Sequence, residues 1–123
     1  MSNDRRLTGA LGHAAGQAAE ARIAADYESR GYPVCAVRWR GTAGELDLVA
    51  RDGAGLIFVE VKKSRSFDRA LERLSQRQIN RIFTTAEEYA AQLPTGSLTD
   101  MRFDVALMND RGEIRILENA LMA

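Results

Sequence analysis

The sequence predicts a mixed α/β domain, in which a central sheet of about five strands is flanked by helices. Two segments have the composition or the apolar spacing of helices, and several short runs are rich in β-branched and aromatic residues, which favour strands. Three of these runs follow one another across short connections. A chain of 123 residues is long enough for one hydrophobic core and too short for two comfortable ones, so we expect a single domain over residues 1–123.

The first helix is expected over residues 12–30, after a loose polar tail at residues 1–11. Gly31 follows it at the position where a left-handed residue commonly ends a helix. Glu20 lies at the edge of the apolar stripe of this helix. That stripe consists of Gly12, Gly16, Ala19, Ile23 and Tyr27.

Three strands are expected next, over residues 32–40, 45–50 and 56–63. Pro33 has no N–H group, so it marks either the first residue of its strand or a strand at the edge of the sheet. The turn "RDGAG" is rich in glycine and short. Connections of this length favour an antiparallel meander over parallel strands.

A long helical segment follows, with apolar residues at spacings of three and four. The helix begins either near Asp68 or at Ser75, because "SQRQ" is a capping-box pattern. Two final strands are expected in "MRFDVALM" and "EIRILENA", on either side of the turn "NDRG". The predicted order is therefore α-β-β-β-α-β-β.

Composition excludes several classes of protein. Seventeen basic and seventeen acidic residues cancel, so a nucleic-acid partner must be bound by a local basic patch. Cys35 and His13 are the only soft metal ligands, which argues against a zinc site and against a disulfide. No apolar run reaches the length of a membrane span or a signal peptide, so we expect a cytoplasmic protein without a membrane partner.

Acidic residues interrupt two of the most apolar predicted strands. Strict alternation in "GELDLVA" places Leu46 and Leu48 on one face of the sheet and Asp47 on the other. In "FVEVK" the alternation places Glu60 and Lys62 on a common face. If the two strands pair across their turn, all three polar side chains share one face.

Such a cluster suits metal-assisted chemistry. Mg²⁺ (or Mn²⁺) commonly binds one or two protein carboxylates, here Asp47 and Glu60, and keeps water and substrate oxygens as its other ligands. We expect Lys62 to hold or activate the attacking water and to neutralise developing negative charge. Glu20 is the fourth candidate catalytic residue, through a water-mediated contact.

Structural interpretations stand beside these assignments. Glu45 is compatible with a rim carboxylate paired to Arg51, and Glu20 with a solvated or salt-bridged helix residue. Asp104 fits a pair with Arg102 or a turn cap better than a metal ligand. The acidic cluster as a whole is also compatible with a salt-bridge network in a structural or protein-interaction domain.

Basic residues gather in one stretch of the chain. Between Lys62 and Arg81 there are seven basic residues against two acids, and four arginines lie four positions apart. A continuous helix would present these four as one stripe that could follow a phosphate backbone, although a solvated helix face is an equally good interpretation. The predicted nucleic-acid contacts are Arg38, Arg40, Lys63, Arg65, Arg69, Arg73, Arg77, Gln78 and Arg81.

Several segments, taken in order, resemble a known group of enzymes. They are "GQAAEARIAADYESRGY", "VRWRGTAGELDLVARD", "LIFVEVKKSR", "INRIFTTAEEYA", "RFDVALM" and "ENALM". Together they resemble the PD-(D/E)XK nuclease superfamily, which has the restriction-endonuclease-like fold. The resemblance is closer to the YraN family of small bacterial proteins, which is similar to archaeal Holliday-junction resolvases.

This resemblance implies a site. It puts the superfamily's helix glutamate on Glu20, its metal aspartate on Asp47, and its Glu-x-Lys motif on Glu60 and Lys62. It implies a Mg²⁺-dependent endonuclease that hydrolyses structured or branched DNA and that can act as a homodimer.

The chain departs from the family pattern at two positions. Gln78 stands where the family usually has a lysine, and Arg38 stands where it usually has an asparagine. Gln78 can still hydrogen-bond a phosphate or a water but adds no charge. The alternative function is therefore a non-catalytic nucleic-acid-binding or assembly module that retains a relic nuclease site.

Overall fold

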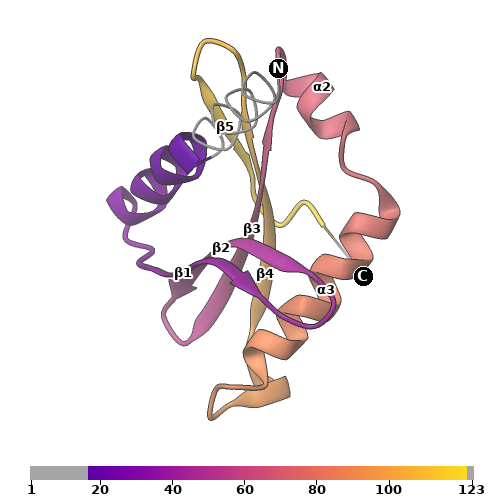
Figure 1. The fold of residues 1–123 in the computed structure, drawn as a ribbon. Coiled ribbons are helices and arrows are strands. Elements are labelled where there is room, and N and C mark those ends of the chain that lie inside the picture. Colours follow the sequence, from indigo (N-terminus) through magenta and orange to yellow (C-terminus); the bar gives the residue numbers. More distant parts are fainter. Residues whose placement is uncertain (1–16, 122–123) are drawn as a thin grey trace, which may run out of the picture.

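The computed structural model describes residues 17–121, which form one five-stranded mixed sheet with helices on both faces (Figure 1). The strands lie in the order β1-β2-β3-β4-β5. β1, β2 and β3 form an antiparallel meander, β4 lies parallel to β3, and β5 lies antiparallel to β4. The predicted fold class and the predicted meander are confirmed. The strands are β1 (Val34–Arg40), β2 (Glu45–Asp52), β3 (Gly55–Lys63), β4 (Met101–Met108) and β5 (Ile114–Leu117).

The edge-strand interpretation of Pro33 is correct, because β1 is an edge strand, whereas Pro33 lies just before Val34, the first residue of β1. The β2–β3 turn is tight, since Asp52 pairs with Gly55. Gly53 in this turn has a φ of 59°, in the left-handed region that glycine adopts at low cost. The last strand is shorter than predicted and ends at Leu117.

The first helix is described over residues 17–29, and Gly31 follows it with a φ of 88°. The predicted tail at residues 1–11 lies outside the described residues, as do Gly12, His13 and Gly16. None of the helices within residues 17–121 combines the length and the apolar character that crossing a membrane requires.

The two proposed starts of the second helix both occur, as separate helices. α2 (Phe67–Glu72) is capped by Ser66, and α3 (Gln76–Ala90) is capped by Ser75, whose Oγ accepts a hydrogen bond from the Gln78 N–H at 3.2 Å. Ser75 has an extended backbone, because its side chain replaces a helical hydrogen bond at this point. The continuous helix that would carry one arginine stripe is therefore wrong: Arg69 is on α2, Arg73 is its C-cap, and Arg77 and Arg81 are on α3.

Each face of the sheet has its own apolar core. The first helix packs on one face through Ala19, Ile23 and Tyr27, all at most 2% exposed. Helices α2 and α3 cover the other face through Ala70, Ile82 and Ala86. Full burial of a side chain such as Ile23 contributes about 1.5–3 kcal/mol. The sheet is thus held between two layers of helices. The cluster of Asp47, Glu60 and Lys62 must lie where these helices leave the strands β2 and β3 accessible.

The hairpin of β1 and β2 changes faces part-way along its length. Leu48 packs in the core under the first helix, and its partner Val37 lines a pocket there. Leu46 packs in the α3-side core together with its partner Trp39. The predicted alternation that put Leu46 and Leu48 on one face is therefore wrong, because both strands turn over between these two pairs. Asp47 lies between Leu46 and Leu48, at the position where the strands change faces.

A buried acid ties three parts of the chain together. Asp104 on β4 is 0% exposed and accepts hydrogen bonds from the Tyr27 hydroxyl at 2.6 Å, from two nitrogens of Arg102 at 3.0 Å, and from the Asn119 N–H at 2.8 Å. The predicted pairing with Arg102 is confirmed. This carboxylate anchors the first helix and the C-terminal segment to the sheet.

Candidate metal and nucleic-acid site

Asp47 and Glu60 lie side by side on neighbouring strands. The register pairs Leu48 of β2 with Val59 of β3. Because the strands are antiparallel, the adjoining positions Asp47 and Glu60 oppose each other. Their carboxyl groups are close enough to share a hydrogen bond when one of them is protonated. Glu60 is only 7% exposed. The structure thus brings together the two acids that the sequence placed on one face.

The meander opens at this pair. The Val61 N–H donates a hydrogen bond to Asp47 Oδ2 at 2.8 Å. A side-chain acceptor therefore takes the place of a carbonyl of the strand ladder, just beyond Leu48 and Val59, the last paired residues of β2 and β3 at this end. This contact fixes the orientation of the Asp47 carboxylate.

The two carboxylates are held in an environment that disfavours their ionised forms. Burial, followed by the negative charge of Asp47, raises the pKa of Glu60 to about 8, while Lys62 acts in the opposite direction. Burial also raises the pKa of Asp47, against the lowering effect of the Val61 hydrogen bond. A buried carboxylate beside a half-buried one supplies the oxygen donors that a hard divalent cation prefers, and the charge of the cation would offset their repulsion. The residues fit Mg²⁺ or Mn²⁺.

Lys62 and Gln78 both contact the same oxygen of Glu60. Lys62 Nζ lies 3.3 Å from Glu60 Oε1, and Gln78 Nε2 donates to this oxygen at 3.4 Å. Gln78 comes from the first turn of α3, so the start of this helix is directed at the site. In place of a lysine, the chain thus offers a neutral donor to the carboxylate.

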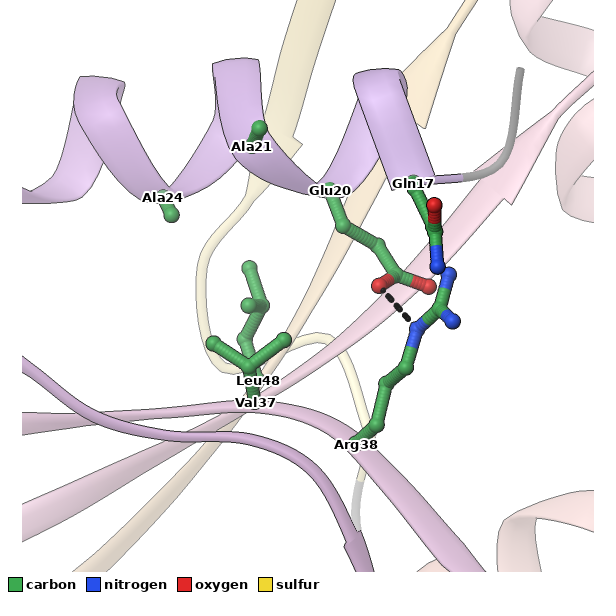
Figure 2. Close-up of a pocket in the computed structure, with 7 residues that line it drawn as sticks. All are labelled: Gln17, Glu20, Ala21, Ala24, Val37, Arg38 and Leu48. Atoms are coloured by element: carbon green, nitrogen blue, oxygen red, sulfur yellow. Dashed lines mark hydrogen bonds and ion pairs between the residues drawn. The ribbon is translucent and has the colours of Figure 1, made fainter. Parts of the chain in front are cut away.

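Glu20 reaches the neighbourhood of the site from the first helix. Its Oε2 accepts a hydrogen bond from Arg38 Nε at 2.8 Å, as Figure 2 shows. The negative charge of Glu20 contributes to the raised pKa of Asp47, which places the two acids in electrostatic range. Within residues 17–121, no group of three or more histidine, cysteine or acidic side chains is close enough to hold a metal ion. Asp47 and Glu60 thus remain the candidate direct ligands, and Glu20 remains a candidate for a water-mediated contact.

A pocket of about 300 Å³ opens between the first helix and the β1–β2 hairpin. Its walls are mostly apolar, and the pair formed by Glu20 and Arg38 stands at one side of it (Figure 2). Neither Asp47 nor Glu60 lines this pocket, which meets the site only through Glu20 and Arg38. The lining residues are Gln17, Glu20, Ala21, Ala24, Val37, Arg38 and Leu48.

The predicted basic contacts are distributed over several elements. Arg40 at the end of β1 has a side chain that is 82% exposed and lies 3.5 Å from Glu45. The suggested pairing of Glu45 with Arg51 is therefore wrong. Arg73 Nη1 donates to the Lys63 carbonyl at 3.3 Å, which ties the end of α2 to the end of β3. The other predicted basic contacts on these elements are also exposed: Lys63, Arg65, Arg69, Arg77 and Arg81.

One residue beside the site was missed by the sequence analysis. Glu88 on α3 accepts hydrogen bonds from the Thr42 N–H at 2.9 Å, from the Thr42 hydroxyl at 2.8 Å and from the Ala43 N–H at 3.2 Å. It thereby clamps the loop between β1 and β2. Local spacing could not have identified this contact, because Thr42 and Glu88 are 46 positions apart and lie in two different segments of the family resemblance.

Fold and site together define an α/β domain with a paired-carboxylate site at the open end of an antiparallel meander. A sequence profile described as "Uncharacterised protein family UPF0102" matches residues 19–108, and the chain belongs to this family, which is the YraN family. The chain is 54% identical to a UPF0102 protein of Roseobacter denitrificans, over 98% of this chain and 94% of that protein. It is 53% identical to one of Cereibacter sphaeroides, over 95% of this chain and 100% of that protein. A UPF0102 protein of Dinoroseobacter shibae is 43% identical over 99% of this chain and 91% of its own length.

Proposed function

We propose that the chain is a divalent-metal-dependent nuclease that hydrolyses phosphodiesters in structured or branched DNA. The observation that carries this proposal is the placement of Asp47 opposite Glu60 on neighbouring strands, with Asp47 held by the Val61 N–H at 2.8 Å and Lys62 Nζ 3.3 Å from the buried Glu60. Two paired acids beside an ammonium group form a costly arrangement in a plain structural core. They match what metal-assisted phosphodiester hydrolysis needs.

The roles follow from position. Asp47 and Glu60 would hold Mg²⁺ or Mn²⁺, which when bound polarises the phosphodiester and acidifies a water. Lys62 places a positive charge beside the pair, where it can hold the attacking water and stabilise charge on the phosphate. The Val61 N–H orients the Asp47 carboxylate, and the Gln78 amide orients that of Glu60. The two acids would therefore need little reorganisation to bind the cation.

DNA would approach across the basic residues around the site. The chain has no net charge, so the attraction must be local and must weaken steeply as salt rises. Lys63 at the end of β3 and Arg77 at the start of α3 are exposed, and each is next in the chain to a residue that contacts Glu60. The resemblance to junction resolvases favours a branched substrate and a homodimer, because symmetric cutting of a junction needs two sites.

The same resemblance favours the restriction-endonuclease-like form of this α/β fold. The order of helix, meander, helices and final hairpin, with a parallel β3–β4 pair, is compatible with it. The acids then lie on the strands where the superfamily carries its motif.

A second candidate is a nucleic-acid-binding or assembly module that no longer cleaves. It is favoured by Gln78, which contacts Glu60 as a neutral amide where the family usually has a lysine. This module would bind DNA without divalent metal, with an affinity that falls as salt rises.

The test is cleavage of labelled junction, flap and single-stranded DNA in Mg²⁺ and in Mn²⁺. We expect cleavage by the unmodified chain and loss of cleavage in Lys62→Ala and Glu60→Gln. Glu87→Gln, an exposed acid on α3, serves as the matched control and should retain activity. Failure to cut any of these DNAs, or undiminished cutting by Lys62→Ala, overturns the nuclease. DNA binding that persists in EDTA without cleavage supports the second candidate.

A further inference from the structure

Arg38 has a backbone conformation that is unusual in a strand. Its φ is 52°, in the left-handed region that residues other than glycine seldom adopt. It lies between Val37, which lines the pocket under the first helix, and Trp39, which packs in the α3-side core. In a regular strand these two neighbours would share a face. The turn-over of the hairpin is therefore made at Arg38 on β1, across from Asp47 on β2.

This conformation commits the Arg38 side chain to a contact inside the protein. Its Nε lies 2.8 Å from Glu20 Oε2, and the exposures of the two side chains are 26% and 14%. Arg40, two residues later, makes a looser 3.5 Å pair and has a side chain that is 82% exposed. The two arginines of β1 are thus in different situations, although both were predicted as nucleic-acid contacts.

We propose that Arg38 is a positioning residue that holds Glu20 beside the metal pair, rather than a contact to DNA. This inference rests on the proposed function. Without a positive neighbour, the carboxylate of Glu20 would be repelled by the charge of Asp47 and would turn to solvent. The Arg38 guanidinium offsets the negative charge of Glu20, and its Nε–H group fixes the orientation of the Glu20 carboxylate. Glu20 is then available to accept a hydrogen bond from a metal-bound water.

Other residues could make the same backbone turn without supplying the ion pair. An asparagine can adopt the left-handed conformation easily but carries no charge to pair with Glu20. Arg38 keeps this backbone conformation and adds the counter-ion. The left-handed backbone of Arg38 and its ion pair with Glu20 are therefore linked, because the backbone turn directs the Arg38 side chain to the first helix.

The first test measures Mn²⁺ affinity by titration calorimetry. We expect Arg38→Gln and Glu20→Gln each to weaken Mn²⁺ binding about tenfold, as loss of an outer-shell partner commonly does. The double variant should bind Mn²⁺ no more weakly than either single variant, because both substitutions break the same ion pair. Arg38→Lys, which keeps the charge without the planar fork, should give an intermediate affinity. Arg111→Gln, in the turn before β5, is the control and should bind like the unmodified chain.

The second test measures how DNA affinity depends on salt in the absence of divalent metal. An arginine that contacts a phosphate contributes about one unit to the slope of log affinity against log salt. We expect Arg40→Gln to lower the slope by about one and Arg38→Gln to leave it unchanged. A slope lowered by about one in Arg38→Gln, or additive Mn²⁺ effects of Arg38→Gln and Glu20→Gln, overturns the inference.

The outcomes separate this inference from the proposed function. If the unmodified chain binds Mn²⁺ and cuts DNA while Arg38→Gln retains full Mn²⁺ affinity, only the positioning role is overturned. If the unmodified chain neither binds Mn²⁺ nor cuts DNA, the proposed function fails and the inference fails with it. Circular dichroism of Arg38→Lys and Arg38→Gln establishes that both fold, and a folded Arg38→Lys alone suffices to test the intermediate affinity.

Discussion

The carboxylate of Asp47 accepts a hydrogen bond from the main-chain N–H of Val61 at 2.8 Å, on the strand that also carries Glu60. This contact gives Asp47 a structural role in addition to its proposed role as a metal ligand. The acid closes the opening of the meander and at the same time is held against a second acid. The two roles make opposite demands on stability, because the hydrogen bond stabilises the fold and the neighbouring charge destabilises it.

Replacing Asp47 by asparagine should separate these two roles. The amide oxygen of Asp47→Asn can still accept from Val61, and the substitution removes the charge beside Glu60. We expect the metal-free variant to be at least as stable as the unmodified chain, whereas Asp47→Ala should lose about 1–2 kcal/mol with the hydrogen bond. Both variants should bind Mn²⁺ at least tenfold more weakly. Urea unfolding in EDTA and calorimetry measure the two effects.

The neighbouring acid supplies the control for this experiment. Glu45→Gln alters an exposed carboxylate on the same strand, so its stability and its Mn²⁺ affinity should stay close to those of the unmodified chain. Equal destabilisation by Asp47→Asn and Asp47→Ala would contradict the assignment, because it would mean that the charge itself stabilises the fold.

Glu60 should make the metal-free protein less stable as pH rises. Its pKa is raised by burial and by Asp47 to about 8, above the ordinary value of 4.5. The stabilisation from the protonated form is therefore fully present below about 4.5 and is lost as pH rises through about 8. Each pKa unit corresponds to about 1.4 kcal/mol, so the loss should amount to a few kcal/mol. Urea unfolding in EDTA between pH 5 and 9 measures it.

Glu60→Gln isolates this effect. The amide does not ionise, so the difference in unfolding free energy between the variant and the unmodified chain should grow toward high pH. Saturating Mn²⁺ should remove most of the pH dependence in the unmodified chain, because the cation favours the ionised carboxylate. Parallel stability curves for the two proteins from pH 5 to 9 would contradict the raised pKa.

Local sequence patterns were sufficient for most of the fold. The β-branched runs and glycine turns specify strands whose pairing follows from short connections, and β4 has the predicted bounds Met101–Met108. The proximity of Asp47 and Glu60 could also be anticipated, because two strands joined by a tight turn have one register in which the turn closes. These features depend on residues that are near one another in the chain.

The remaining features depend on contacts that the sequence pattern does not encode. The period-two rule failed at Leu46, because a left-handed residue on the neighbouring strand turns both strands over. The long helix was divided, because Ser75 competes for a backbone N–H that a continuous helix would use. The bond between Tyr27 and Asp104 joins residues 77 positions apart, and no local pattern specifies such a pair.

The anchor at Asp104 should govern stability and leave the metal site unchanged. Tyr27→Phe removes one of the hydrogen bonds to a fully buried carboxylate, so we expect a loss of about 1–3 kcal/mol. Asp104→Ala should cost more, about 3–5 kcal/mol, because Arg102, the Tyr27 hydroxyl and the Asn119 N–H all lose their shared acceptor. Thermal unfolding measures both losses. Mn²⁺ affinity of folded Tyr27→Phe should equal that of the unmodified chain, and a tenfold loss would show that the first helix transmits the change to the site.

Glu88 should control the mobility of the loop between β1 and β2. Its carboxylate accepts from Thr42 and Ala43, and the hydrogen bonds from Thr42 lower the pKa of Glu88. The clamp is therefore present above the ordinary carboxyl pKa and is lost as pH falls through the lowered value. In Glu88→Ala, we expect the amide protons of Thr42 and Ala43 to exchange with solvent at least tenfold faster, as measured by NMR, with Glu87→Ala as the adjacent control. Because this loop connects Arg38 to Asp47, the same variant should weaken Mn²⁺ binding. Faster exchange without weaker Mn²⁺ binding would show that the site is held by the sheet alone.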